Sequence, residues 1–171
     1  NSGNILSRGL DTKELKYWYL DDPQGANIEN YLLQDGDILL NFINSAAQIG
    51  KSCIFKSLGR DCIYTTNLFC IRVGNKISSS FLHSLMSQER FKKEISLITK
   101  PAVNQASFTK EDLSNIIILL PTLEEQNFIM KSLEAIDKNI TNQHHKLETF
   151  QSLKKSLMQD LLTGKVRVQV N

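Results

Sequence analysis

The last third of the chain carries an apolar repeat that a single helix cannot bury on itself. Apolar positions alternate in steps of four and three along residues 129–161, the heptad pattern of a coiled coil, with Gln143 and Lys154 as polar interruptions. The apolar members of this seam are Ile129, Leu133, Ile136, Ile140, Leu147, Phe150, Leu157 and Leu161. We therefore expect a second long helix to cover the seam. An ordinary long helix packed on a globular body is the alternative.

Signals for the beginning and the end of this helix are clear. Thr122 and Glu125 can form a reciprocal capping box, and Pro121 stands just before the cap. No Gly or Pro follows before Gly164, which can adopt the left-handed conformation that ends many helices. We expect one helix over residues 122–163, about 60 Å long at ~1.5 Å per residue. A short basic and apolar tail, residues 164–171, follows it.

Positive charge is concentrated in the middle of the chain. Residues 1–50 contain three basic and seven acidic residues, residues 51–110 ten and three, and residues 111–171 seven and eight. A segment with this excess of Lys and Arg is typical of a surface that faces a polyanion, although scattered solvated lysines would give the same count.

The cysteines and the hydropathy point to a cytoplasmic protein. Cys53, Cys62 and Cys70 are odd in number and form no CxxC pair, so we expect reduced thiols in apolar, strand-like surroundings. No apolar run has the length of a membrane span, and no signal peptide is recognisable. The chain begins at Asn1 without Met, and we expect it to be part of a longer protein or a half-length one.

The first 121 residues predict a small α+β domain of short strands with a few helices. One helix is expected from Phe81 to about Ile95, capped by Ser78–Ser80, and a short capped helical turn at Thr109–Asp112. Residues 41–50 are expected to form a polar loop. The expected strands are Tyr17–Leu20, residues 37–40 after the Asp35–Gly36 turn, Ser52–Phe55, Cys62–Tyr64, Leu68–Val73 and Ile116–Leu120.

No catalytic constellation is evident. Gly50–Lys51–Ser52 resembles the end of a phosphate-binding loop, but Ser45 stands where that loop requires its first Gly. His144 and His145 are adjacent on a helix and point to different sides, so they do not form a metal pair. There is no GxGxxG loop for an adenosyl cofactor. We expect a chain that is not an enzyme and that holds no metal and no cofactor.

Three segments of the long helix resemble the specificity (S) subunits of type I restriction-modification enzymes. These are LPTLEEQ at residues 120–126, the segment with Leu133, Ile136, Asp137 and Ile140, and LKKSLMQDLLTGKVRV at residues 153–168. The front of the chain agrees in order and spacing with a target recognition domain of that family. The matching positions are Asp35–Leu40, Asn44–Ser45, Ile49–Lys51, Thr65–Asn67, Val103–Ser107, Leu113 and Ile116–Pro121. The usual opening of the domain is absent, and one recognition domain and one helix are present where the family has two of each.

The resemblance implies a non-catalytic subunit that binds double-stranded DNA. It implies a recognition domain over residues 1–121, a helix over residues 122–163 that pairs antiparallel and spaces two half-sites, and methylation (M) subunits that dock on the chain and carry S-adenosylmethionine. The endonuclease (R) subunit can join this assembly. The seam also needs a partner, so we expect a homodimer or pairing with a second half-subunit, hence a split target that is palindromic for the homodimer.

Side chains that can contact DNA are amides, hydroxyls and basic groups in the loops. Asn, Gln, Arg and Lys read base edges, whereas Lys, Arg, Ser and Thr hold phosphates. An Asn or Ser that only stabilises a turn is the alternative at each polar position. The candidates are Asn41, Asn44, Ser45, Gln48, Lys51, Arg60, Thr66, Asn67, Lys76, Arg90, Lys92, Lys93, Lys100, Asn104 and Gln105.

Two other functions stay open at this point. A coiled-coil assembly adaptor with a protein-binding head would account for the helix equally well, but not for the basic middle segment. A specificity module of a related fused restriction-methylation system shares every feature of the sequence. DNA affinity that falls steeply with salt would separate DNA binding from the adaptor function.

Overall fold

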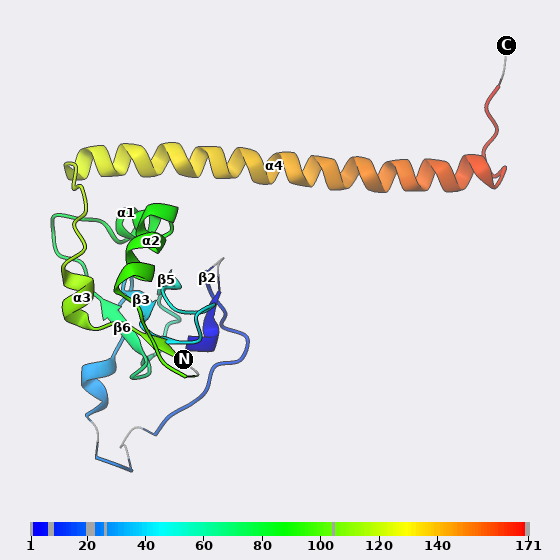
Figure 1. The fold of residues 1–171 in the computed structure, drawn as a ribbon. Coiled ribbons are helices and arrows are strands. Elements are labelled where there is room, and N and C mark those ends of the chain that lie inside the picture. The colour runs from blue at the N-terminus through cyan, green and yellow to red at the C-terminus, as the bar shows by residue number, and fades with distance from the viewer. Residues whose placement is uncertain (1, 7–8, 20–22, 26, 104, 170–171) are drawn as a thin grey trace. The chain divides into compact units, whose positions relative to one another are not determined.

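The computed structural model describes residues 2–6, 9–19, 23–25, 27–103 and 105–169, which divide into two compact units. Unit 1 comprises residues 1–127 and unit 2 residues 128–171. Each unit is described by itself (Figure 1). In chain order the elements are η1 (Ser2–Asn4), β1 (Ile5–Leu6), β2 (Gly9–Leu10), η2 (Ile28–Tyr31), β3 (Ile38–Asn41), β4 (Ile43–Asn44), β5 (Ser52–Ile54), β6 (Leu68–Ile71), α1 (Ser79–Met86), α2 (Glu89–Ile98), β7 (Lys100–Pro101), β8 (Ala106–Ser107), α3 (Lys110–Ser114) and α4 (Leu123–Leu162).

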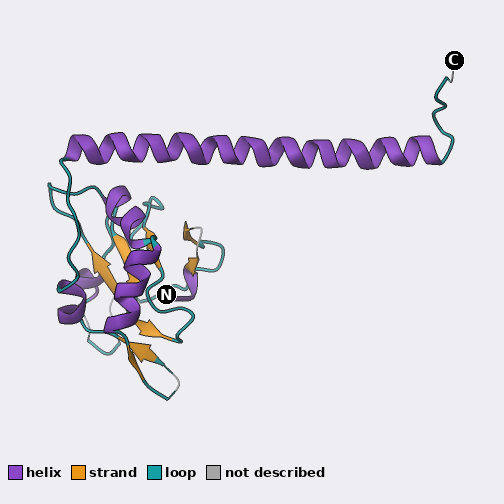
Figure 2. Ribbon diagram, turned by 45° about the horizontal axis from the view of Figure 1, so that its top comes forward, coloured by secondary structure: helices purple, strands orange, loops and turns teal. Residues whose placement is uncertain are grey.

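Strand β3 is the centre of unit 1. It lies between β5 and β6 in an antiparallel three-stranded sheet, and all its residues are buried. Successive side chains of a strand point to opposite faces. Ile38 and Leu40 pack against α1, α2 and Phe108, which cover one face (Figure 2). Leu39 packs on the other face against Ile5, which belongs to the small β1–β2 hairpin. Burial on both faces explains why this strand is an unbroken apolar run.

The predicted α+β class and the long helix are confirmed. Helix α4 begins after Thr122, whose hydroxyl accepts a hydrogen bond from the Glu125 N–H at 3.3 Å while the Glu125 carboxylate accepts from the Thr122 N–H at 2.8 Å. Gly164 has φ +72°, the left-handed conformation that the sequence predicted after the helix. The buried strand after Asp35–Gly36 and the capped turn at Thr109 are also present.

The single helix predicted over residues 81–95 was wrong, because two helices lie there. Helix α1 ends at Met86 and α2 begins at Glu89, with Ser87 and Gln88 between them. In one continuous helix Met86 and Phe91 would point about 140° apart, at 3.6 residues per turn. The break allows both side chains to enter the same core cluster.

Three predicted strands were also wrong. Tyr17–Tyr19 form an exposed irregular segment, and Leu20 lies outside the described residues. Residues 62–64 make only an isolated bridge, between Ile63 and Leu32. Ile116–Leu120 are not in a strand, and Ile117 and Leu119 are largely exposed. Each run has strand-forming residues, but a strand also needs a neighbour with free hydrogen-bonding groups, which local sequence does not supply. Conversely, Ile43–Asn44 form β4 inside the segment predicted to be a loop.

An ion pair between the buried Asp37, just before β3, and the half-exposed Arg72, just after β6, links these two strands. The Asp37 carboxylate accepts hydrogen bonds from Arg72 Nε at 2.8 Å, from Arg72 Nη2 at 2.7 Å and from the Gln34 N–H at 2.8 Å. Burial acts to raise the pKa of Asp37, but the hydrogen bonds from Arg72 and Gln34 outweigh it, so the pKa lies below the ordinary value of 3.8. The pair therefore stabilises the fold while the carboxylate is ionised.

Asn41, at the end of β3, has a fully buried side chain whose amide oxygen and nitrogen have no hydrogen-bond partner among the described residues. By strand alternation it lies on the same face as Leu39. A buried amide without partners costs about 1–3 kcal/mol. The residue therefore weakens a core that is otherwise apolar.

We expect Asp37→Asn to lower the free energy of unfolding by about 1–3 kcal/mol at pH 7, because a charged bidentate pair is lost. A group whose pKa is depressed on folding contributes stability above its unfolded pKa and loses it as pH falls through the folded value. The difference between the variant and the unmodified chain should therefore shrink below about pH 3.8. Urea unfolding from pH 7 to pH 3 measures this. Asp61→Asn, at an exposed position, is the control, and equal stability of both variants at pH 7 would contradict the role of the pair.

We expect Asn41→Val to raise the free energy of unfolding by about 1 kcal/mol, because it replaces an unpaired amide by an apolar group of similar size. Asn41→Asp should lower it, since a carboxylate would be buried there. Differential scanning calorimetry on the three proteins tests this. A valine variant that melts below the unmodified chain would show that the Asn41 amide has a stabilising partner.

Candidate nucleic-acid interface

The structure gathers polar segments that are far apart in sequence at one end of the central sheet. Asn41 pairs with Leu68 of β6, and Leu40 pairs with Ser52 of β5. The residues that precede these two partners, Asn67 and Lys51, therefore lie beside the same end of β3. The loop that follows β3 begins there as well, so three of the predicted DNA-contacting segments share one end of unit 1.

The loop over residues 42–50 is closed by backbone groups. The Asn41 N–H donates to the Lys51 carbonyl at 2.9 Å, and the Gly50 N–H donates to the Asn41 carbonyl at 2.8 Å. Gly50 has φ +77°, and a Cβ at this position would lie 2.9 Å from Cγ2 of Ile95 in α2. Only glycine suits that conformation and that contact. The loop is thus held at its base and against α2, with Ser45 exposed and Gln48 half-exposed.

A second small sheet brings the hairpin over residues 100–107 to this loop. Strand β8 lies between β4 and β7, and Asn44 pairs with Ala106. Gln105 directly precedes Ala106 and is exposed, so this pairing brings the Gln105 segment beside the Asn44–Ser45 turn although about 60 residues separate them in sequence. Asn44 also accepts a hydrogen bond from the Ser45 N–H at 2.8 Å through its side-chain oxygen, which fixes the turn. Loop and hairpin together form one polar surface.

Some predicted contacts are already engaged within the domain. The Asn67 amide donates to the Ser2 hydroxyl at 3.0 Å and accepts from the Thr65 hydroxyl, so it stabilises its turn. Thr66, beside it, is exposed. The Lys100 ammonium lies 3.2 Å from the Asp112 carboxylate, an exposed pair that leaves most of the lysine side chain accessible. Lys51 is half-exposed at the base of the loop.

One predicted contact is not supported by the structure, and another falls on a residue outside the described part of the chain. The Asn41 side chain is fully buried on the same face of β3 as Leu39, so the prediction that it contacts DNA is not retained. Asn104 lies outside the described residues. Residue type could not reveal the burial of Asn41, since Asn is usually exposed.

Arg60 and Lys76 lie toward the opposite end of the sheet. Ile54 and Ile71 both pair with Ile38, so the segments that follow β5 and β6 leave the sheet at the end away from the loop. Arg60 Nη1 donates to the Tyr17 hydroxyl at 3.2 Å, and its guanidinium carbon is 5.5 Å from the centre of that ring. The structure does not bring these cations together with the polar surface of loop and hairpin.

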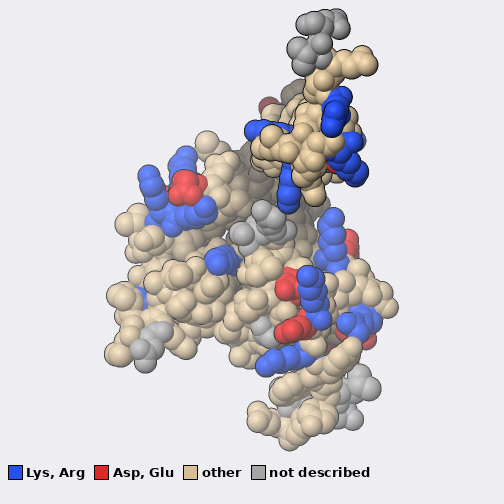
Figure 3. Space-filling model, turned by 90° about the vertical axis from the view of Figure 1, so that its right-hand side faces the viewer, with Lys and Arg blue, Asp and Glu red and all other residues tan. Residues whose placement is uncertain are grey.

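Helix α2, which contacts the loop through Ile95, carries exposed basic residues on its outer side. Phe91 and Ile95 are buried, and Arg90, Lys92 and Lys93 are exposed. Lys92 Nζ is 2.6 Å from the Glu89 carboxylate, a pair exposed enough to contribute little stability. In Figure 3 the basic side chains form several separate groups, some with acidic neighbours, and not one continuous patch. The excess charge of residues 51–110 is therefore spread over unit 1.

One candidate at the interface was missed from the sequence. Val103, in the turn of the β7–β8 hairpin, is 99% exposed. An exposed apolar side chain beside polar readers can contact the methyl group of thymine. In the sequence, the sign of this role is the position of the valine between Pro101 and the amides of residues 104–105. That its side chain is exposed and not part of the core is seen only in the hairpin.

The described residues contain no group of three His, Cys, Asp or Glu side chains that could hold a metal ion. Burial raises the pKa of the Cys53 thiol to about 11, and burial with the nearby Asp37 raises that of Cys70 to about 11, so both thiols stay protonated near neutral pH. Cys62 lies outside any strand, contrary to the expected strand-like surroundings.

Within the described residues, every helix is too short or too polar to cross a membrane.

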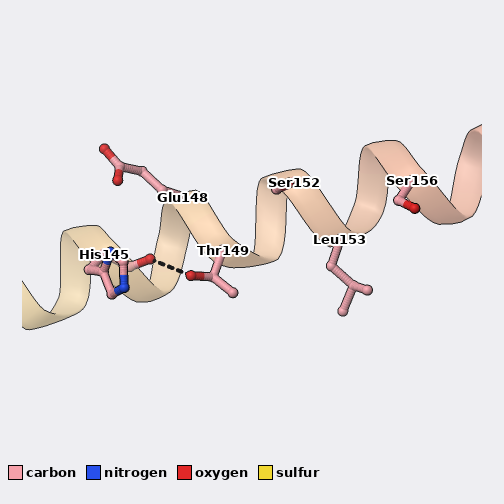
Figure 4. Close-up of a pocket in the computed structure, with 6 residues that line it drawn as sticks. All are labelled: His145, Glu148, Thr149, Ser152, Leu153 and Ser156. Atoms are coloured by element: carbon pink, nitrogen blue, oxygen red, sulfur yellow. Dashed lines mark hydrogen bonds between the residues drawn. The ribbon is translucent and has the colours of Figure 1, made fainter.

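Unit 2 exposes both faces of its helix. The predicted seam residues are 40–66% exposed, from Ile129 to Leu161. Another side of α4 carries a shallow open surface formed by His145, Glu148, Thr149, Ser152, Leu153 and Ser156 (Figure 4). There the Thr149 hydroxyl donates to the His145 carbonyl at 2.9 Å, a bond within the helix. This surface is part of one helix and encloses no cavity that could hold a cofactor.

Comparison with known proteins places this geometry in a family. A family model described as "Type I restriction modification DNA specificity domain" matches residues 4–151. Two curated relatives from Methanocaldococcus jannaschii are similar to the chain. The putative type I restriction enzyme MjaX specificity subunit is 35% identical over 149 residues, covering 86% of this chain and 35% of the relative. The type I restriction enzyme MjaVIII specificity subunit is 35% identical over 143 residues, covering 81% and 33%.

The chain thus spans about a third of the length of the curated relatives it matches. A solved structure is also similar, described as "Structural basis underlying complex assembly and conformational transition of the type I R-M system". It has a TM-score of 0.55 and 25% identity, and the match covers 73% of this chain and 29% of that one. The sequence match extends from unit 1 well into α4. The chain belongs to the family of type I restriction modification DNA specificity domains.

Proposed function

We propose that this chain is the DNA-recognising component of a type I restriction-modification system and reads one half of a split target. The observation that carries the proposal is the polar surface formed by the loop over residues 42–50 and the β7–β8 hairpin. Asn44 and Gln105 belong to two segments that strand pairing brings side by side there, and amide side chains are suited to reading base edges. The family assignment supports DNA as the ligand. The adaptor function gains no support from the comparisons.

The division of labour follows from this proposal. Residues 1–121 are the recognition domain, residues 122–163 the spacing helix and residues 164–171 the tail. Arg90, Lys92 and Lys93, which are exposed on α2, are the proposed phosphate contacts. The chain itself performs no catalysis. Methyl transfer from S-adenosylmethionine belongs to M subunits and cleavage to an R subunit, all acting in the cytoplasm.

The seam on α4 supports a paired helix. Its side chains are half-exposed in the single chain, and a heptad stripe of this length is stabilised when a second helix covers it. A second copy, packed antiparallel, would place two recognition surfaces in two-fold symmetry and give a palindromic target. A second half-subunit with its own recognition domain would give an asymmetric one.

Selection from random duplex DNA, with the chain mixed with its methylation subunit at moderate salt, tests the function. Two copies of the chain should enrich a split palindromic motif. A single short motif would indicate an undimerised recognition domain, and no enrichment by a folded chain would favour the adaptor. Binding should also weaken steeply with salt, since phosphate contacts release counterions.

We expect Asn44→Ala with Gln48→Ala to weaken binding to the selected duplex by roughly 5- to 150-fold for each bidentate base contact that is lost, corresponding to ~1–3 kcal/mol per contact. Fluorescence anisotropy on selected and scrambled duplexes measures the effect. Asn75→Ala with Gln151→Ala, at exposed positions outside the interface, is the matched control. Equal losses on both duplexes would assign the pair to phosphate contact or folding.

We expect the unmodified chain to scatter light as a particle of twice the chain mass, and Ile140→Glu to scatter as a single chain. A carboxylate in the centre of a coiled-coil seam is desolvated without a partner. Lys138→Glu, two residues away on the opposite side of the helix, should keep the dimer. A folded unmodified chain with the mass of one copy at micromolar concentration would refute self-pairing.

A further inference from the structure

One glutamine at the start of α4 is buried as deeply as the apolar core. The side chain of Gln126 is fully buried. The structure describes all 40 residues of α4, and among them Gln126 is the only buried one. It belongs to unit 1, which extends to Asn127. The first turn of the helix is therefore part of unit 1, whereas the helix from Phe128 onward belongs to unit 2.

The Gln126 amide joins three chain segments. Its oxygen accepts a hydrogen bond from the Ser78 N–H at 2.9 Å. Its nitrogen donates to the Lys76 carbonyl at 3.0 Å and to the Pro121 carbonyl at 2.9 Å. One acceptor and two donors are thus satisfied by backbone groups of the segment before α1 and of the segment before α4. Only an amide supplies this combination at this length.

The same contact links the starts of two helices. Ser78 is the N-cap of α1, and its hydroxyl accepts from the Phe81 N–H at 3.2 Å. Its own N–H is the group that Gln126 binds. The capping box of Thr122 and Glu125 fixes the beginning of α4 four residues before Gln126. A displacement of the α4 start would therefore break bonds at the α1 cap as well.

We propose that Gln126 is a positioning residue that fixes the start of α4 on the recognition domain and thereby sets the spacing at which the proposed half-sites are read. This proposal rests on the proposed function, because spacing has meaning only if the helix separates two recognition surfaces. Gln126 touches no DNA and acts through the helix start. Its loss leaves the base-reading loop intact, since the hydrogen bonds that close the loop involve other residues.

The test uses the full chain with two substitutions of different character. Gln126→Leu keeps the side-chain volume but leaves the Ser78 N–H and two carbonyls without partners. Gln126→Glu keeps the acceptor for Ser78 but places a carboxylate against the carbonyls of Lys76 and Pro121. Gln151→Leu, at an exposed position of the same helix, is the matched control. Each variant enters the selection from random duplex DNA with the methylation subunit.

The unmodified chain and the control should enrich one spacing between half-sites. Both Gln126 variants should enrich the same half-site sequences over several spacings, and their preference for the original spacing should fall about tenfold or more, because the helix start is no longer fixed. Affinity for a duplex with one half-site should stay within about twofold. A single unchanged spacing in folded variants would overturn the proposal.

Hydrogen exchange on the unmodified chain provides a test that needs neither a variant nor DNA. If Gln126 fixes the helix start, the Ser78 N–H and the Gln126 N–H should exchange as slowly as amides of β3. Exchange at the rate of a frayed helix end would overturn the proposal even if the variants lose stability. No enrichment by the unmodified chain would contradict DNA recognition. The exchange rates would still show whether Gln126 fixes the start of α4.

Discussion

Burial of β3 on both faces is the constraint on which the rest of unit 1 depends. Ile38 and Leu40 hold α1 and α2 on one face, and Leu39 holds the N-terminal hairpin on the other. The strand also aligns both neighbours through antiparallel pairing, so its end at Asn41 decides where Lys51 and Asn67 lie. The polar surface proposed to read DNA is thus positioned by apolar contacts that it does not share.

Polar groups inside this domain have two different energetic roles. Each polar side-chain atom of the buried Asp37 and Gln126 has a hydrogen-bond partner, and each residue ties together segments that are distant in sequence. Asn41 is buried without described partners. Satisfied groups specify one arrangement of the chain, because any other arrangement leaves them unpaired. The two satisfied side chains therefore contribute uniqueness more than net stability.

The features that the sequence predicted correctly are determined by residues close to them in the chain. The capping box at Thr122, the glycine at residue 164 and the heptad spacing each lie within a few residues of what they determine, and the helix was placed to within one residue at each end. The predictions of strands at residues 17–20 and 116–120 were wrong, because strand pairing depends on residues that are distant in sequence. The convergence of Asn44 and Gln105 likewise required the register of β4 with β8. The break between Met86 and Phe91 follows from core packing, which no local pattern encodes.

The closure of the loop over residues 42–50 involves backbone atoms at its base, at Asn41, Gly50 and Lys51. Side chains on the loop can therefore be exchanged without removing these bonds, provided that Gly50 keeps its place against Ile95. In a loop of this kind, the backbone bonds that fix its shape are separate from the side chains that are proposed to read DNA. New binding preferences can then arise by point substitution at Ser45 or Gln48 while the fold is inherited unchanged, which makes this loop the part of the domain best suited to rapid diversification.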